Sequence, residues 1–434
     1  MVQANTFPRH GSYVDSGIDW LGEIPSDWSL ESIRAVTQLK SEKNRPELQV
    51  LSVYRDYGVI TKDSRDDNHN ATSLDTSGYK VVDEGDLVVN KMKAWQGSMG
   101  VSEHYGIVSP AYITCRVDAE RVSPKFLHYL LRSQPFIGAY NALSYGVRVG
   151  QWDMHYEDFK CIPLPLPDRT LQQRIANFLD QKTVEIDEAV AKKQRLIELL
   201  KEQKAILINQ SVTKGLNPDV TMRDSGVEWI GAVPEHWKIK RLKYLITCPL
   251  QYGANEEAKN CVEGDPRYIR ITDFSDDGLL KPDTKRTLPE EKAKGYFLNK
   301  GDILFARSGA TVGKTFLFDS DEISCFAGYL IRATADPSKI DPVYLYLYTK
   351  SSAFGCWRDV TFSKATIQNI GADKYSTLPV VIPPLSEQKA TLQHIALLEK
   401  DINSSLIAAQ KQIDLLHEFK QTLIAEAVIG KIKI

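Results

Sequence analysis

The segment with the most specific chemical pattern runs from Gly309 to Thr315 and reads GATVGKT. Its glycines, lysine and threonine approach the loop that cradles nucleotide phosphates, for which the pattern is GxxxxGK followed by Ser or Thr. The spacing is one residue short, and Ser308 stands where the first glycine belongs. The residues that follow, up to Asp319, predict a strand, whereas a phosphate loop opens a helix whose N-terminus receives the phosphates. We therefore expect a turn or a contact with a nucleic-acid backbone here, and no nucleotide site.

Other catalytic patterns are missing from the sequence. HExxH, GxSxG and GxGxxG do not occur, and neither does the Asn/Asp-Pro-Pro-Tyr/Phe signature of amino-methyltransferases. The six cysteines form no CxxC pair, which argues against a zinc cluster or a disulfide framework and favours a cytoplasmic location. His155 stands alone among carboxylates and is expected to serve packing or to lie at the surface. The sequence predicts no catalytic residue, no metal site and no cofactor bound by this chain.

Four segments concentrate side chains that suit contact with nucleic acid. Arg and Lys suit guanine and phosphate, Asn and Gln suit adenine, and small hydroxyls suit either. The segments span residues 90–98 and 145–152 in the first half of the chain, and 307–314 and 361–369 in the second. The candidate DNA-binding residues are Lys91, Lys93, Trp95, Gln96, Ser98, Tyr145, Arg148, Gln151, Arg307, Ser308, Thr311, Lys314, Lys364, Thr366, Gln368 and Asn369. Any one of these cations could equally be a solvated surface charge, so the loops carry the prediction.

These loops belong to two copies of one unit. DSGIDWLGEIPSDW starts at Asp15 and returns as DSGVEWIGAVPEHW at Asp224. In each copy a Gly-Asp pair then introduces an apolar strand pattern, DLVVNKM and DILFARS, and a short helix opened by proline follows, SPKFLHYLLRS and DPVYLYLYTKS. Each copy therefore predicts short mixed strands, one small helix and a proline-rich end. The duplicated tryptophans are expected to join each domain to the helices rather than to stack on bases.

A long helical pattern follows each proline-rich stretch, with matched heptads at an offset of 216 residues. The apolar stripe positions are Leu179, Ile186, Val190, Ile197, Leu200 and Leu207 in the first helix, and Ile395, Ile402, Leu406, Ile413, Leu416 and Leu423 in the second. A lysine recurs at the same stripe position, as Lys204 and Lys420. Either stripe alone could pack on its own domain, but two matched stripes favour an antiparallel coiled coil. The first helix would be roughly 65 Å long at 1.5 Å per residue.

Composition agrees with a globular protein of several domains. The chain has 434 residues, of which 42% are hydrophobic and 25% charged, and no apolar run suits a membrane span. The formal net charge of -2 means that any contact with a polyanion must come from local patches.

The chain resembles the specificity subunits of type I restriction-modification systems. The resemblance rests on the SGxxWxGxxPxxW opening, the Gly-Asp strand with its glycine-rich loop, the entry Pro384 to Gln388 into the second helix, and the duplicated domain-helix order. At the first helix entry the residues Pro167 to Gln173 depart from that pattern, although Gln173 is retained. The resemblance covers nearly the whole chain.

The resemblance implies a non-catalytic DNA reader. Each target-recognition domain would read one half of a bipartite sequence in double-stranded DNA, and the helices would fix the gap and dock two modification subunits. Those partners would transfer methyl groups from S-adenosylmethionine, and two restriction subunits using ATP and Mg²⁺ would complete the assembly. Similar scaffolds with different loops are what two different half-sites require.

The expected fold is therefore α/β (α+β), with two similar mixed α/β target-recognition domains separated by two long antiparallel coiled-coil helices, in an internal pseudo-twofold repeat. The expected boundaries are residues 1–167 and 215–383 for the domains, and 168–214 and 384–434 for the spacer helices. A coiled-coil adaptor with two protein-binding domains and no DNA readout remains the alternative.

Overall fold

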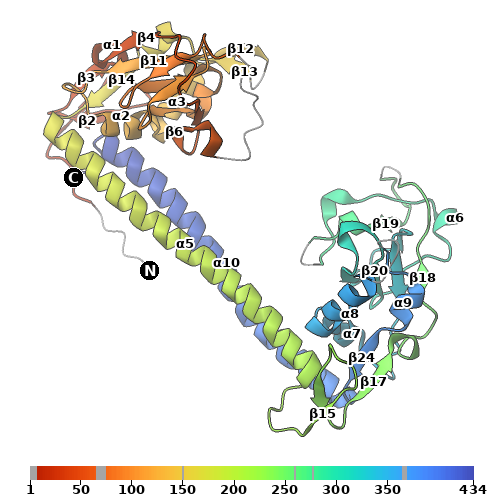
Figure 1. The fold of residues 1–434 in the computed structure, drawn as a ribbon. Helices are drawn as coiled ribbons and strands as arrows, with labels where there is room; N and C mark the ends of the chain where they lie inside the picture. Colours follow the sequence, from red (N-terminus) through yellow and green to blue (C-terminus); the bar gives the residue numbers. More distant parts are fainter. Residues whose placement is uncertain (1–6, 65–74, 149–150, 259–260, 276–277, 364–368) are drawn as a thin grey trace. The chain divides into compact units, whose positions relative to one another are not determined.

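The computed structural model describes residues 7–64, 75–148, 151–258, 261–275, 278–363 and 369–434 (Figure 1). The chain divides into two compact units, residues 1–194 with 410–434 and residues 195–409. Each unit holds one mixed α/β domain together with parts of both long helices, which confirms the predicted fold class.

The first unit is built around a four-stranded antiparallel sheet in the order β4-β11-β8-β9. These strands are Thr37–Lys40, Tyr112–Val117, Leu87–Asn90 and Met99–Val101. Five two-stranded pairs surround it: β1 with β2 (Tyr13–Asp15, Glu23–Pro25), β3 with β14 (Ser29–Ser32, Pro163–Leu166), β5 with β6 (Leu51–Tyr54, Gly58–Thr61), β7 with β10 (Lys80–Val82, Gly106–Val108) and β12 with β13 (Tyr145–Arg148, Gln151–Asp153). The helices are α1 (Ile33–Val36), α2 (Pro124–Leu131), α3 (Gln134–Leu143) and α4 (Tyr156–Phe159), with 3₁₀ turns η1 (Lys62–Ser64) and η2 (Lys91–Gln96).

The second unit repeats the central sheet in the order β18-β23-β20-β21. These strands are Gln251–Tyr252, Leu330–Ala333, Ile303–Ala306 and Thr315–Leu317. Around it lie β15 with β16 (Met222–Asp224, Ala232–Pro234), β17 with β24 (Lys238–Arg241, Pro379–Ile382) and the parallel pair β19 and β22 (Arg267–Ile269, Ser324–Phe326). The helices are α6 (Glu290–Ala293), α7 (Pro342–Tyr348), α8 (Ser352–Ser363) and α9 (Ala372–Ser376), with 3₁₀ turns η3 (Leu242–Tyr244), η4 (Ile271–Asp273), η5 (Pro282–Thr284) and η6 (Gly309–Thr311).

The duplicated Gly-Asp pair sets the start of the central strand in each unit. Gly85 and Gly301 take φ of 89° and 95°, which favours glycine. Asp86 accepts a hydrogen bond from the backbone N–H of Asp83 at 2.9 Å, and Asp302 accepts the equivalent bond from Asn299 at 2.8 Å. The carboxylate therefore closes the turn that precedes the strand, and the four residues of β8 and of β20 that follow are all buried.

The prediction of one small helix per copy is wrong, because each unit has a second helix of similar size directly after the first. In the first unit α3 follows α2, and in the second α8 follows α7. The sequence QPFIGAYNAL of α3 has its proline in the first turn, where a helix accepts it, but its glycine lowers helix propensity. Burial of Phe136 and Tyr140 in the domain stabilises the helix instead.

The long helices are α5 (Arg169–Lys214) and α10 (Leu385–Val428). A buried glutamine fixes the start of each. Gln172 accepts from the N–H of Ser123 at 2.7 Å and donates to the carbonyl of Pro167 at 2.9 Å. Gln388 makes the same two bonds, to Asp341 at 2.8 Å and to Pro383 at 3.0 Å. Gln172, not Gln173, is therefore the counterpart of Gln388.

Candidate nucleic-acid interface

In the first unit the two predicted polar segments lie together. The N–H of Met154, just after β13, donates to the carbonyl of Lys91 at 2.9 Å. Lys91 begins η2 at the end of the central strand β8, and Gly97 with φ of 84° ends that turn. The β12–β13 hairpin is thereby attached beside the loop that follows β8, so the scaffold presents both segments on one side of the domain.

The candidate side chains of these two segments differ in their exposure and in their contacts. Lys93 is exposed, and so is Tyr145, which stacks on His155 at 5.0 Å between ring centroids. Trp95 packs edge to face on Trp152 at 5.2 Å, and its indole N–H is buried without a partner in the described part of the chain. Lys91 forms an ion pair with Asp153 at 3.2 Å.

The four remaining candidates of this unit are less accessible or not described. Gln96 is half-buried, and Ser98 is only 3% exposed. Ser98 thus lies inside the domain, where its backbone pairs with Asn90 and Lys93 and closes the loop. Arg148 and Gln151 stand on β12 and β13, and their side chains lie outside the described part of the structure.

The second unit makes the same junction. The N–H of Ile370 donates to the carbonyl of Arg307 at 2.8 Å, and both residues stand 216 positions after Met154 and Lys91. Ser308 and Asn369 also form an isolated antiparallel bridge. The structure thus brings together the loop after the central strand and the segment before the last small helix in both units.

The candidates of the second unit are also placed unequally. Lys314 is exposed, while Ser308 and Thr311 are half-buried, with the Thr311 hydroxyl donating to the carbonyl of Ser308 at 3.4 Å. Asn369 is half-buried, and its side-chain oxygen has no partner among the described residues. The predicted loop 361–369 begins as the end of α8, and Lys364, Thr366 and Gln368 lie outside the described residues.

Two residues that sequence reasoning missed flank Arg307. The guanidinium carbon of Arg307 lies 5.1 Å from the ring centroid of Tyr252 and 6.0 Å from that of Tyr329. Tyr252 is on the edge strand β18, and Tyr329 precedes β23, so neither belongs to a polar loop. Their positions were the only signal. Tyr252 is on β18, which pairs with β23, and Tyr329 directly precedes β23, which pairs with β20.

The glycine-rich segment after Arg307 is not a phosphate loop. Residues Gly309–Thr311 form a single 3₁₀ turn, and the chain continues into strand β21 rather than into a helix. Without a helix N-terminus, the loop lacks the row of free N–H groups that a nucleotide phosphate requires. The expectation of a turn between strands is confirmed.

Burial shifts the pKa of one basic side chain in each domain. Burial lowers the pKa of Lys350 to about 8, with Lys314 nearby, and its ammonium donates to the carbonyl of Thr315 at 2.8 Å. Burial lowers the pKa of His128 to about 4, with further lowering by Arg132. Arg132 follows α2 and Lys350 follows α7, and each donates to a backbone carbonyl, so both cations serve the scaffold.

The described residues hold no group of three or more His, Cys, Asp or Glu side chains placed to bind a metal ion. Among the same residues, no helix is long and apolar enough to cross a bilayer.

The duplicated opening motif anchors each domain to a helix end. A side chain at Gly430, just after α10, would meet the indole of Trp28, and one at Gly215, just after α5, would meet that of Trp237. Both glycines take positive φ, so they can turn the chain beside the ring. Trp237 also donates its indole N–H to Glu387 at 2.9 Å. The expected joining role of these tryptophans agrees with this packing.

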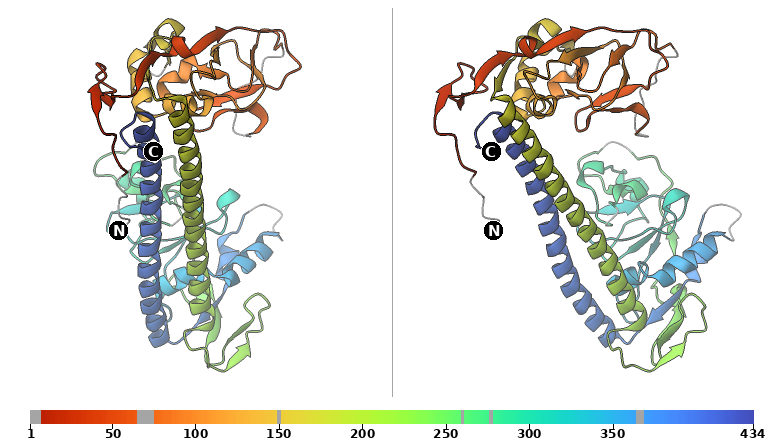
Figure 2. Two further views of the ribbon diagram at one scale, coloured as in Figure 1. Left: turned by 90° about the vertical axis from the view of Figure 1, so that its left-hand side faces the viewer. Right: turned by 60° about the vertical axis from the view of Figure 1, so that its left-hand side comes forward.

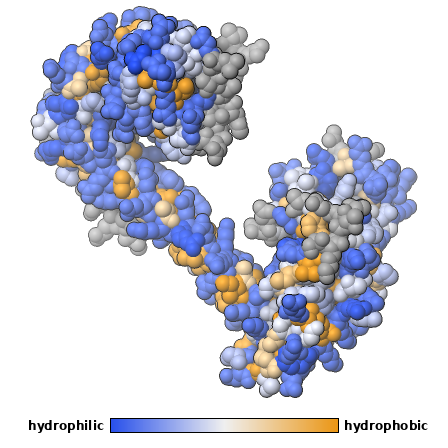
Figure 3. All heavy atoms as spheres, viewed as in Figure 1, coloured by the Kyte–Doolittle hydropathy of each residue, from blue (hydrophilic) through white to orange (hydrophobic). Residues whose placement is uncertain are grey.

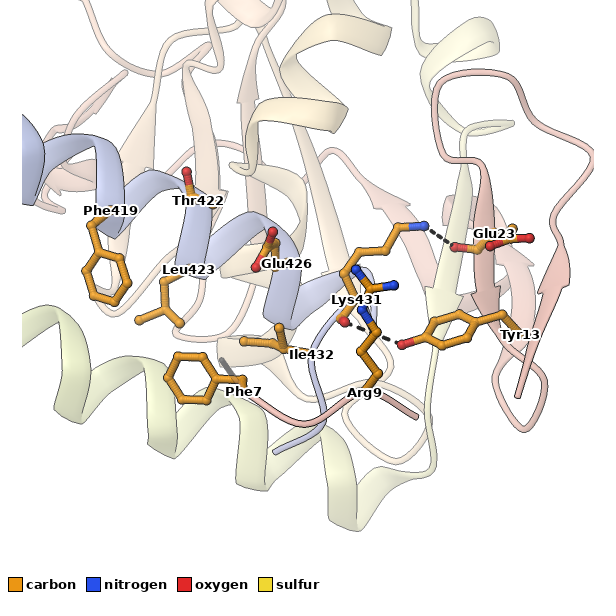
Figure 4. A pocket seen from close by; sticks show the side chains of 10 residues that line it. All are labelled: Phe7, Arg9, Tyr13, Glu23, Phe419, Thr422, Leu423, Glu426, Lys431 and Ile432. Carbon is orange, nitrogen blue, oxygen red and sulfur yellow. Dashed lines mark hydrogen bonds between the residues drawn. The ribbon is translucent and has the colours of Figure 1, made fainter. Parts of the chain in front are cut away.

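A groove of about 650 Å³ lies beside the end of α10 in the first unit (Figure 4). Phe7, Phe419, Leu423 and Ile432 supply apolar walls. At its other end the Tyr13 hydroxyl donates to the carbonyl of Lys431 at 3.3 Å, and the Lys431 ammonium donates to that of Glu23 at 2.8 Å (Figure 4). This groove belongs to the joint between helix and domain, and it contains none of the predicted DNA-binding residues.

Within each unit, part of α5 lies antiparallel beside part of α10 (Figure 2). The predicted stripe residues are all buried or half-buried there. Ile395 is part of the domain core of the second unit, together with Val212 of α5. At Ile395, therefore, the stripe packs on the globular core of the second unit.

Other apolar side chains on the helices face solvent (Figure 3). In the second unit Leu397 and Ile407 of α10 are 65% and 70% exposed, and Leu196, Leu199 and Ile206 of α5 are exposed as well. Single exposed apolar residues are ordinary, and these five stand on the two long helices of one unit.

Comparisons with known proteins agree with this architecture. Residues 234–412 match the family model of the type I restriction modification DNA specificity domain. The StySPI specificity subunit of a type I restriction enzyme from Salmonella potsdam is 22% identical over 95% of this chain and 90% of its own length. The EcoBI specificity subunit from Escherichia coli is 22% identical over 82% and 75%.

Solved structures share the fold. A chain from a study of complex assembly and conformational transition of the type I R-M system aligns with a TM-score of 0.71 at 16% identity, covering 94% of this chain and 99% of that chain. The HsdS subunit from Thermoanaerobacter tengcongensis aligns with a TM-score of 0.56 at 16% identity, covering 94% and 98%. From its duplicated scaffold, its long helices and these relatives, we conclude that the chain belongs to the specificity subunits of type I restriction-modification systems and carries their DNA specificity domain.

Proposed function

We propose that this chain reads a bipartite sequence in double-stranded DNA, with one domain for each half-site. One observation carries the proposal: the same backbone hydrogen bond, from Met154 to Lys91 and from Ile370 to Arg307, presents two polar segments on the same scaffold in both units. The residues displayed there differ between the units, and this is the difference that two distinct half-sites require.

The chain acts without chemistry of its own. Methyl transfer from S-adenosylmethionine belongs to two modification subunits, and ATP-dependent cleavage to two restriction subunits, in a cytoplasmic complex. The solvent-facing apolar residues of α5 and α10, such as Leu397 and Ile407, support docking of the modification subunits on the helix pair.

Reconstitution with the modification subunits tests this proposal. We expect the complex to methylate one bipartite sequence, and the isolated chain to bind DNA weakly because its net charge of -2 supplies few phosphate contacts. Tight, salt-sensitive specific binding by the isolated chain would contradict the second expectation. A complex that methylates DNA without sequence preference would contradict the first.

The helices are proposed to set the gap between the half-sites. Removal of seven residues from each helix keeps the heptad register and shortens each by about 10 Å. We expect a changed gap with unchanged bases at both ends, measured by methylation mapping. Changed bases with an unchanged gap would refute the spacer role.

The alternative of a coiled-coil adaptor predicts that the polar loops are dispensable. Lys93→Ala and Arg307→Ala would then leave the activity of the assembled complex unaltered, whereas DNA readout requires a change in affinity or sequence preference.

A further inference from the structure

Two backbone hydrogen bonds fix the main chain at Arg307. Its N–H donates to the carbonyl of Tyr329 at 3.1 Å, and its carbonyl accepts from Ile370 at 2.8 Å. It follows directly on β20, an inner strand of the central sheet. The main chain at this residue is therefore fixed from two sides by rigid elements, which is the support that a precise contact needs.

The side chain also contacts two aromatic rings, which we call the tyrosine clamp. The guanidinium carbon lies 5.1 Å from the ring centroid of Tyr252 and 6.0 Å from that of Tyr329. The Tyr252 hydroxyl accepts from the N–H of Ala372 at 2.9 Å, which fixes that ring at the start of α9. Tyr252 is 40% and Tyr329 61% exposed, so this tyrosine clamp opens to solvent. Much of the rotamer entropy of Arg307 is already lost before any ligand binds.

No carboxylate of the described residues lies within ion-pair distance of Arg307, and its Nε is buried without a partner there. The first unit differs at this place. Its counterpart Lys91 is neutralised by Asp153 at 3.2 Å, whereas the residue equivalent to Asp153 in the second unit is the uncharged Asn369. The pairing of Tyr112 with Asn90 and of Leu330 with Ala306 further places Ala111 where the second unit has Tyr329.

Building on the proposed function, we propose that Arg307, in contact with Tyr252 and Tyr329, reads a guanine in the half-site of the second domain. Two parallel N–H groups of its guanidinium would donate to N7 and O6 of the base in the major groove. The first domain has no such reader at the equivalent position, since Lys91 is paired with Asp153 and cannot form the planar fork.

The clamp favours a base edge over a phosphate. A phosphate accepts hydrogen bonds from many directions, so a flexible cation is sufficient for it. Readout of guanine requires the fork to lie in the plane of the base, and contact with two rings restricts the orientations open to the guanidinium. The proposal therefore predicts a loss at one base position rather than a general loss of affinity.

The test uses the full chain assembled with its modification subunits and a library of duplexes randomised at each half-site. The substitution Arg307→Lys keeps the charge but removes the fork. We expect it to reduce the preference for guanine at one position of one half-site by about 10- to 100-fold, with the other positions unchanged. An equal loss on every sequence would assign Arg307 to a phosphate and overturn the proposal, as would an unchanged profile.

Matched variants separate the clamp from the fold. Tyr329→Phe keeps the ring and should keep the guanine preference, whereas Tyr329→Ala should weaken it at the position affected by Arg307→Lys. If Tyr329→Ala altered a different position, the clamp would be refuted. Unchanged thermal unfolding of Arg307→Lys confirms that the domain is intact. Failure of the wild-type complex to prefer any sequence would refute the proposed function itself, which is a distinct outcome.

Discussion

Lys420 of α10 donates to both carboxylate oxygens of Asp187 on α5, each at 2.7 Å. The second unit contains the counterpart of this contact, since Lys204 of α5 meets Asn403 of α10 at 3.4 Å and pairs with Glu399 at 3.0 Å. Lys204 and Asn403 stand 216 residues from Lys420 and Asp187. The two parts of the helix pair therefore share one antiparallel register, and a polar residue at the stripe position marks it.

The replacement Asp187→Asn should change the free energy of unfolding by less than about 1 kcal/mol, because the ion pair is largely exposed and such pairs contribute little. Asn403 already serves in the equivalent place with an amide. Chemical denaturation of the variant and the parent measures the difference. A loss above about 2 kcal/mol would show that the charge, rather than the polar contact, stabilises this part of the pair.

Two isoleucines that stand five residues apart on α10 differ strongly in burial. Ile402 is 8% exposed and Ile407 is 70% exposed. We expect Ile402→Ala to cost about 2–4 kcal/mol of stability through the cavity it leaves. Ile407→Ala serves as its control and should cost no more than about 0.5 kcal/mol. Equal losses in thermal or chemical unfolding would contradict the assignment of the helix seam.

For binding of the modification subunits, the exposed Ile407 should matter more than the buried Ile402. Ile407→Gln removes exposed apolar surface and is expected to weaken binding of the modification subunits by about tenfold without lowering stability. Titration of labelled modification subunit measures the affinity, and Lys294→Gln, an exposed change in the domain of the same unit, is the control. Unaltered affinity would exclude this part of α10 from the interface.

Regular patterns made most of the fold predictable. The heptads, the Gly-Asp strands and the proline-opened helices are local signals, and α5, α10, β8, β20, α2 and α7 lie where those patterns place them. The helix α3 was missed because its glycine lowers helix propensity, and the burial of Phe136 that stabilises the helix cannot be read from the local sequence. Gln173 was assigned as the retained glutamine although the 216-residue offset of the heptads pairs Gln172 with Gln388, and the bond of Gln172 to Ser123 confirms that pairing.

The sequence predicted which segments form the candidate site, but not which of their residues are in contact or buried. The pairing of Met154 with Lys91 joins residues 63 positions apart and leaves no local pattern. Tyr252 and Tyr329 were missed because each looks like an ordinary strand-edge aromatic, and their contact with Arg307 arises from the order of strands in the sheet. Ser98 shows the opposite error, since a polar residue in a polar loop is turned inward to close it.

His128 gives the first domain a defined sensitivity to acid. Its Nε2 accepts from Arg132 at 2.9 Å, so the ring must be neutral, and burial lowers its pKa from 6.5 to about 4. The unfolded state binds the proton more readily, so stability is complete above pH 6.5 and falls as the pH drops towards 4. We expect a loss of roughly 1–3 kcal/mol over that range.

Unfolding midpoints measured between pH 7 and pH 4 test this prediction against His128→Gln, which keeps an acceptor for Arg132 but cannot be protonated. The variant should lose less stability than the parent between pH 6.5 and pH 4. Parallel curves for both proteins would mean that other groups cause the acid sensitivity.

Lys93 is expected to contact the DNA backbone without reading the sequence, in contrast to Arg307. It is exposed in the loop after β8, and its flexible ammonium suits a phosphate rather than a base edge. In the assembled complex, Lys93→Ala should lower affinity by a similar factor for every sequence and leave the base preferences of both half-sites intact. Because one phosphate contact releases about one counterion, the slope of log K against log salt should become shallower by roughly 0.9. A changed base preference in the first half-site with an unchanged salt slope would instead make Lys93 a reader of bases.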